Sequence, residues 1–130
     1  MALTALDLSP EALKKYRPLA AIRRRRSAAA ETRLANRRRR AMQTARKIAE
    51  LLHREFEARG VVVFGSLARR GGFTPWSDID LAAKGIPPTR FYEAVGMVTG
   101  ISAEFKIDLV DVGSCVPSLR KKIETEGKLV

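Results

Sequence analysis

The spacing of hydrophobic residues divides the chain into a helical first half and a second half of short alternating segments. Residues 20–58 contain neither Gly nor Pro and are rich in Ala, Arg and Leu, which favour helix. Before them, Ser9 and Pro10 are suited to begin a short helix, which Pro18 is expected to end or bend. Gly60 is expected to close the long helix. Apolar residues in its last third follow one helix face: Ala41, Ala45, Ile48, Ala49, Leu52 and Phe56.

Beyond this helix the pattern changes to short segments separated by turns rich in Gly and Pro. A β-branched run and two alternating runs predict three strands, and two longer runs between turns predict helices. Strands that alternate with helices indicate an α/β fold. The expected strands cover residues 61–64, 78–83 and 105–112, and the expected helices cover residues 89–98 and 117–126.

Positive charge is concentrated in the helical half. The chain carries 25 basic and 14 acidic residues, a net charge of +11, and residues 1–57 hold 15 of the basic and 6 of the acidic ones, or +9. Two runs of four arginines, 23–26 and 37–40, cannot lie on one helix face, so they are either solvated or in contact with something acidic. The field attracts polyanions such as RNA, or an acidic protein.

The cysteine content and the lack of long apolar runs bear on the cellular compartment in which the protein works. Cys115 is the only cysteine, so no intramolecular disulfide can form, and a reducing, cytoplasmic setting is expected. The sequence has no apolar run of about 18 residues, and its start does not resemble a signal peptide. We therefore expect no association with a membrane.

Three aspartates fall on two of the predicted strands. Asp78 and Asp80 are two residues apart, so their side chains point to the same side of an extended strand. Asp108, on the next predicted strand, could complete a cluster of carboxylates, whereas Asp111 faces the opposite side. Such a cluster repels itself unless hard cations such as Mg²⁺ neutralise it. The pattern therefore predicts a site for two magnesium ions and a phosphate-bearing substrate.

Gly65 and Ser66 follow the first predicted strand and have the properties of a phosphate-binding turn. Glycine lets the backbone approach a ligand closely, and serine offers a hydroxyl. A helix that begins just after them would direct backbone amides at phosphate oxygens. Arg69 could neutralise triphosphate charge or be solvated, and Ser77 could bond a phosphate or cap the start of the next strand.

The second half of the chain resembles the minimal nucleotidyltransferases of the DNA polymerase β superfamily. The resemblance rests on the segments VVVFGSLARRGGFTPWSDIDLAAKGI and FKIDLVDV. The family pattern is a strand, Gly-Ser, a loop of about ten residues, Asp-x-Asp and a later strand with a third Asp. The resemblance implies a polymerase β-like fold, a small mixed sheet flanked by helices. We expect a nucleotidyltransferase domain at residues 45–130 behind a basic helical extension at residues 1–44.

The resemblance also implies roles for the residues that match its motif. Gly65 and Ser66 would grip the β- and γ-phosphates of ATP, and Asp78 and Asp80 would hold magnesium. Asp108 would bind the catalytic metal and help to deprotonate the acceptor hydroxyl. Many relatives are antitoxins of HEPN-domain toxins, and some transfer AMP to a tyrosine of the toxin. We therefore expect Mg-dependent transfer of AMP from ATP to a protein hydroxyl, with a HEPN-type toxin as the partner.

Two other functions stay open at this stage. The protein could be a non-catalytic module that binds a toxin or RNA, the latter through its arginine-rich helix. It could also use the same site to add nucleotides to an RNA 3′ end. The sequence does not decide between these acceptors, nor does it fix the nucleotide or the oligomeric state.

Overall fold

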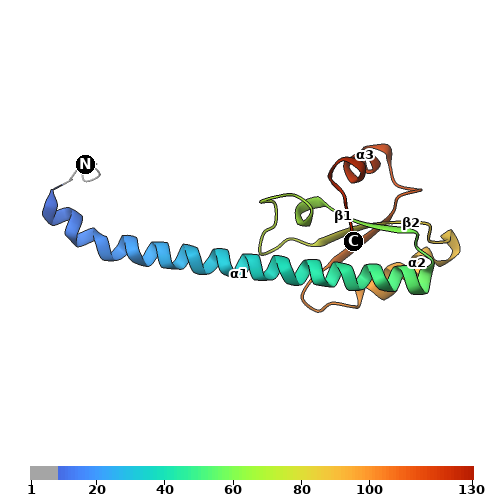
Figure 1. The fold of residues 1–130 in the computed structure, drawn as a ribbon, viewed down its shortest axis with the longest axis horizontal. Coiled ribbons are helices and arrows are strands. Elements are labelled where there is room, and N and C mark those ends of the chain that lie inside the picture. The colour runs from blue at the N-terminus through green and yellow to red at the C-terminus, as the bar shows by residue number, and fades with distance from the viewer. Residues whose placement is uncertain (1–8) are drawn as a thin grey trace. The chain divides into compact units, whose positions relative to one another are not determined.

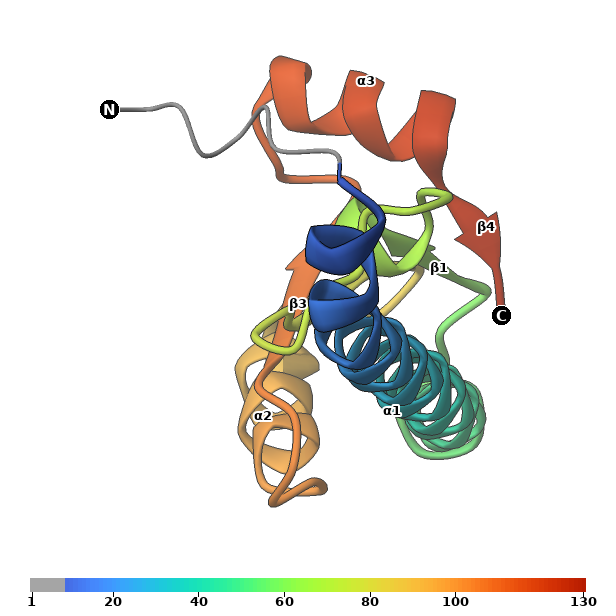
Figure 2. The same ribbon diagram turned by 90° about the vertical axis from the view of Figure 1, so that its left-hand side faces the viewer.

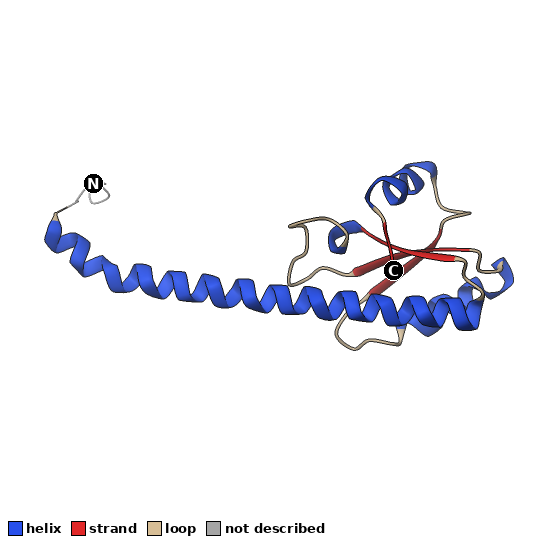
Figure 3. Ribbon diagram, in the orientation of Figure 1, coloured by secondary structure: helices blue, strands red, loops and turns tan. Residues whose placement is uncertain are grey.

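A computed structural model of the protein describes residues 9–130. The chain consists of two compact units, residues 1–35 and residues 36–130. The first helix, α1, runs from Pro10 to Phe56 and so belongs to both units (Figure 1). Residues 36–130 contain the end of α1, a four-stranded sheet and two shorter helices (Figure 3). The α/β fold expected from the sequence is confirmed.

The sheet is mixed, with the strand order β3-β2-β1-β4. The central pair, β1 (Gly60–Phe64) and β2 (Ile79–Lys84), is antiparallel, and β3 (Ile107–Asp111) runs parallel to β2. The short edge strand β4 (Lys128–Leu129) pairs antiparallel with β1 and was not predicted from the sequence. The three expected strands are confirmed, with bounds that differ by at most two residues.

Helices cover both faces of this sheet. Helix α2 (Pro88–Thr99) and the C-terminal part of α1 lie on one face, and α3 (Pro117–Glu126) lies on the other (Figure 2). The predicted apolar face of α1 is confirmed, since all six of its residues are buried. Around α3 a smaller cluster forms from Phe64, Ala82 and Ile123, so side chains of alternate strand residues are buried under helices on both faces.

The two ends of α1 differ from the sequence prediction. Pro18 lies inside one continuous helix and does not end it. At the other end, Glu57 adopts a left-handed conformation (φ 62°), and the amide of Ala58 donates to the carbonyl of Leu52 at 3.1 Å. Glu57, not Gly60, therefore closes the helix, and Gly60 begins β1. No helix within residues 9–130 has the length and apolarity to cross a bilayer.

Candidate active site

Asp80 and Asp108 are direct neighbours across the parallel pair β2–β3. Their Cα atoms are register partners, so the two half-buried side chains leave the sheet on the same face. This is the face covered by α3, because Asp80 is also the partner of Phe64, which packs against Ile123 of that helix. Asp78 lies just before β2 begins. The structure therefore brings together Asp80 and Asp108, two of the three carboxylates that the sequence singled out.

The electrostatics of Asp80 show that the carboxylates influence one another. Burial of Asp80 raises the pKa of its carboxyl above the usual value, and the negative charges of Asp108 and Asp78 raise it further. Lys122 on α3 and Lys106 just before β3 oppose this rise. A cation placed among the carboxylates would relieve the same repulsion.

The two lysines were missed by the sequence analysis. Lys106 precedes Asp108 by two residues, a spacing that could have suggested it. Lys122 becomes a neighbour of Asp80 only because α3 folds over this face of the sheet, and no local pattern indicates that packing.

Gly65 is required by the approach of Asp80. Its φ is +69°, a conformation that favours glycine, and a β-carbon at this position would overlap the Oδ2 atom of Asp80. The register Phe64–Asp80 places the turn after β1 against the carboxylate. The Gly-Ser turn and the Asp-x-Asp strand, which are separated in the sequence, thus meet at one end of the sheet.

The turn itself is shorter than expected. Gly65–Leu67 form a single turn of 3-10 helix, and the amides of Ala68 and Arg69 both donate to the carbonyl of Gly65, at 3.1 and 3.2 Å. The helix expected after the Gly-Ser pair is thus present only as this 3-10 turn, and the next α-helix begins at Pro88. Ser66 lies half-buried within this turn.

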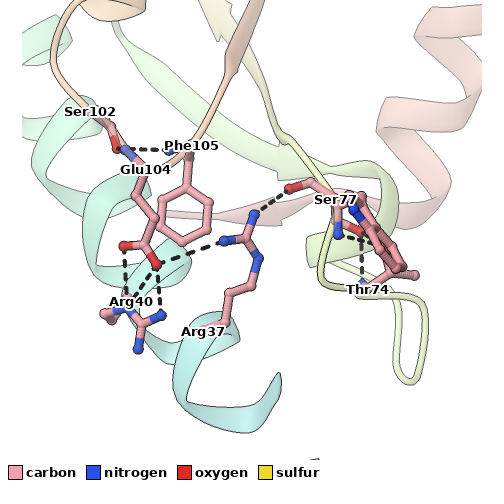
Figure 4. Close-up of polar contacts among 8 residues, drawn as sticks. Arg37, Arg40, Thr74, Ser77, Ser102, Glu104 and Phe105 are labelled. Atoms are coloured by element: carbon pink, nitrogen blue, oxygen red, sulfur yellow. Dashed lines mark hydrogen bonds and ion pairs between the residues drawn. The ribbon is translucent and has the colours of Figure 1, made fainter. Parts of the chain in front are cut away.

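Arg69 and Ser77, the two other predicted nucleotide-binding residues, make contacts within the protein. Arg69 forms an ion pair with Glu126 of α3, with Nη1 and Oε2 3.6 Å apart. The hydroxyl of Ser77 accepts a hydrogen bond from the amide of Thr74 at 2.8 Å and lies 3.0 Å from the Thr74 hydroxyl (Figure 4). Asp111, set apart from the cluster, accepts bonds from the residues of the turn after β3.

The second arginine run contacts the loops of this domain. Arg38 donates to the carbonyl of Leu67 at 2.9 Å, and Arg37 approaches the carbonyl of Ser77 at 3.5 Å. Arg40 forms a two-pronged ion pair with Glu104, with Nη2 and Oε1 2.6 Å apart (Figure 4). Three of the four arginines at positions 37–40 are therefore engaged within the protein, which the sequence did not reveal.

The side chains at this site include oxygen donors that suit a divalent metal. Within residues 9–130, no three His, Cys, Asp or Glu side chains are already arranged as a metal site. Asp80, Asp108 and Asp78 nevertheless supply the carboxylate oxygens that Mg²⁺ prefers, and their mutual repulsion is what such a cation offsets. The residues present therefore fit magnesium.

Comparison with known proteins defines the class. Residues 46–130 match the sequence profile of the family described as polymerase beta, nucleotidyltransferase. The match covers more than half of the chain, and the chain belongs to this family. A search of curated protein sequences gives no match.

Solved structures with the same fold include toxin–antitoxin complexes. One, a toxin–antitoxin with AMP-PNP, is 26% identical over 65% of this chain and 70% of that chain, with a TM-score of 0.55. A candidate nucleotidyltransferase from Sulfolobus solfataricus is 25% identical over 74% and 84% of the two chains, with a TM-score of 0.51. A complex of a tri-AMPylated Shewanella oneidensis HEPN toxin with its MNT antitoxin is 22% identical over 68% and 70%, with a TM-score of 0.52.

Proposed function

We propose that the protein is an antitoxin that transfers AMP from ATP to a hydroxyl of a HEPN-type toxin. The observation that carries the proposal is the register pair Asp80–Asp108 held against the Gly65 turn, in a chain of the nucleotidyltransferase family. On this proposal the two carboxylates would hold metal, and the adjacent Gly-Ser turn would bind phosphate. Both are needed where a triphosphate is bound and cleaved.

The proposed reaction is an in-line substitution at the α-phosphorus of ATP. The acceptor oxygen forms a bond to this phosphorus, the bond to the β-phosphate oxygen breaks, and pyrophosphate leaves. Asp108 takes up the proton of the acceptor hydroxyl. Ser66 and the backbone at Gly65 bind the β- and γ-phosphates, and Lys122 and Lys106 lie near enough to Asp80 to offset negative charge there.

Asp78, Asp80 and Asp108 would hold two magnesium ions. When bound, such ions supply neutralisation of the phosphate charge and activation of the attacking oxygen. The charges of Asp108 and Asp78 add to the raised pKa of Asp80, so this carboxyl is expected to gain from a bound cation.

The comparisons support a protein acceptor. One similar structure is a toxin–antitoxin with AMP-PNP, and another contains an AMPylated HEPN toxin with its MNT antitoxin. Trp76, two residues before Asp78, is 86% exposed and is available to contact a base or a partner protein. An exposed Trp in the loop that leads to Asp78 suits a site that is completed by another chain.

The test is labelling with α-phosphate-labelled ATP and Mg²⁺ in the presence of the protein encoded beside this one. The Asp78→Asn, Asp80→Asn double variant serves as the control. Label on the neighbour that is lost with the double variant supports AMP transfer. No label on either chain, with the complex still formed and the toxin still inhibited by the double variant, would favour a non-catalytic, blocking antitoxin.

A second candidate, a nucleic-acid acceptor, is favoured by one observation. Arg38, Arg70 and Lys128 line a pocket of about 590 Å³ together with Gly71. Lys128 is the register partner of Val63, whose side chain is on the face opposite to that of Phe64 and Asp80. The basic pocket is therefore separate from the carboxylates and suits the phosphates of a bound RNA backbone.

RNA binding has a distinct signature in solution. Affinity for a single-stranded RNA should fall steeply as salt rises, because each neutralised phosphate releases counterions. Incubation with RNA and each labelled NTP separates 3′-end addition from binding alone. A flat salt response, or equal affinity of an Arg70→Ala, Lys128→Ala variant, would count against this candidate.

A further inference from the structure

The eleven-residue loop Leu67–Ser77 joins two parts of the candidate site. It begins directly after Ser66 and ends directly before Asp78. Arg38 donates to the carbonyl at its first residue, Leu67, and Arg37 to the carbonyl at its last, Ser77. Two consecutive residues of α1 thus contact both ends of the loop.

Arg37 is held more firmly than an ordinary surface arginine. Its side chain is only 20% exposed, and its guanidinium carbon lies 4.6 Å from the ring centre of Phe105 and 5.9 Å from that of Phe73, in the middle of the loop. Contacts of this kind between a guanidinium and aromatic faces are attractive, and more so when water is excluded. The Nε atom is buried without a hydrogen-bond partner, a cost that these contacts must offset.

The same arginine also reaches the segment before β3. Its Nη1 lies 3.7 Å from Oε1 of Glu104, which Arg40 holds with two nitrogens (Figure 4). Phe105 and Glu104 precede Asp108 by three and four residues. Arg37 is therefore shared between the loop that ends at Asp78 and the segment that leads to Asp108.

We propose that Arg37 is a positioning residue that fixes the loop 67–77 to the segment 102–106, and so sets the spacing of Ser66, Asp78 and Asp108 for nucleotide binding. Arg38 and Arg40 assist from the same helix. The consequence for nucleotides rests on the proposed function, whereas the consequence for the loop does not. On this view Arg37, Arg38 and Arg40 of the second arginine run are part of the site, whereas Arg39 is solvated.

The experiment compares Arg37→Ala with Arg39→Ala in the full chain. Arg39 belongs to the same run and is exposed, so its substitution removes an equal charge and serves as the matched control. Amide hydrogen exchange of the metal-free, nucleotide-free proteins is measured first, followed by titration with AMP-PNP and Mg²⁺. Sheet amides of β1 and β2 report whether the fold as a whole is retained.

With Arg37→Ala, the amides of residues 68–77 should exchange faster while the sheet amides keep their protection, and Arg39→Ala should match the natural protein. Affinity for AMP-PNP with Mg²⁺ should fall roughly tenfold, the scale of losses when a residue that supports metal ligands is removed. Unchanged loop exchange in Arg37→Ala would overturn the positioning role. Faster loop exchange with unchanged nucleotide affinity would overturn its link to the site.

The test still decides if Arg37→Ala does not fold or if the natural protein does not bind nucleotide. Should Arg37→Ala fail to fold, Arg37→Lys keeps the charge but lacks the flat guanidinium between the rings, and the same loop-specific loss of protection is expected. Should the natural protein not bind AMP-PNP with Mg²⁺, the proposed function fails. The exchange measurement would then still decide whether Arg37 holds the loop.

Discussion

A β-carbon at residue 65 would occupy the same space as the Oδ2 atom of Asp80. Residue 65 lies in the Gly-Ser turn and Asp80 on the neighbouring strand, so the contact joins the two motifs of the site. Because φ at Gly65 is +69°, any other residue meets both a strained backbone and a collision. The conformation and the close approach thus require glycine for separate reasons.

Gly65→Ala should destabilise the protein by about 2 kcal/mol, from the left-handed backbone and from displacement of the Asp80 carboxylate. Gly71→Ala is the matched control, because Gly71 has a similar φ of +73° but nothing within 4 Å of a β-carbon. It should cost only about 1 kcal/mol. Urea denaturation measures both values, and equal losses would show that the collision with Asp80 does not matter.

The coupling between the two residues can be isolated in a double-mutant cycle. In an Asp80→Ala background the colliding atom is gone, so Gly65→Ala should lose about 1 kcal/mol less stability than in the natural chain. Additive effects would contradict the contact.

The elements and the carboxylate pair were predictable because their signals are local. Residues 61–63 are three β-branched valines followed by an aromatic Phe64, and Pro117 and Gly127 mark the two ends of α3. Asp80 and Asp108 lie near the starts of two strands with similar alternation, and neighbouring strands bring such residues together. The prediction needed only strand periodicity and the adjacency of the two strands.

The contacts of the arginines and the formation of β4 were not predictable, because they depend on tertiary packing. The run Arg37–Arg40 reads as uniform positive charge in the sequence, and which arginine faces Phe105 or Leu67 is set by how α1 lies against the loops. Arg69 likewise pairs with Glu126, which is distant in sequence. The two residues of β4 carry no pattern of their own and form a strand only because β1 offers an open edge.

The ion pair of Glu104 with Arg40 should give the protein a dependence on acid pH. The hydrogen bond from Arg40 and its charge lower the pKa of the Glu104 carboxyl below the usual value. The resulting stability is fully present above the pKa that Glu104 has in the unfolded chain, about 4.3. It is lost as the pH falls through the lower pKa that Glu104 has in the folded protein.

The melting temperatures of the natural protein and Glu104→Gln, measured from pH 7 down to pH 3, check this expectation. The natural protein should melt higher at pH 7, and the difference should shrink toward pH 3. Because the pair is exposed, added salt should also reduce the difference. A difference that grows as the pH falls would contradict the pairing.

The boundary of the helical extension can be tested by truncation. The compact unit that contains the sheet begins at Asn36, whereas the family match begins at residue 46. A chain that starts at residue 36 retains Arg37, Arg40 and the buried Ala41, and we expect it to fold with nearly unchanged stability. A chain that starts at residue 45 lacks these contacts and should be less stable by a few kcal/mol. Equal urea midpoints would place the boundary at 44/45.

Asp80→Asn should abolish nucleotide transfer and yet stabilise the metal-free protein. Because the folded pKa of Asp80 is raised, its ionisation costs stability as the pH rises through that pKa, and the neutral amide avoids the cost. The gain should be on the order of 1 kcal/mol or less at pH 7, since Asp80 is only half-buried and solvent screens its charge. It should disappear below the unfolded pKa of about 3.9. Denaturation in EDTA from pH 3 to 8 measures this gain. Addition of Mg²⁺ with AMP-PNP should reverse the order by raising the melting temperature of the natural protein alone. A variant that is less stable than the natural protein in EDTA at pH 7 would show that the carboxylates do not repel one another as the structure indicates.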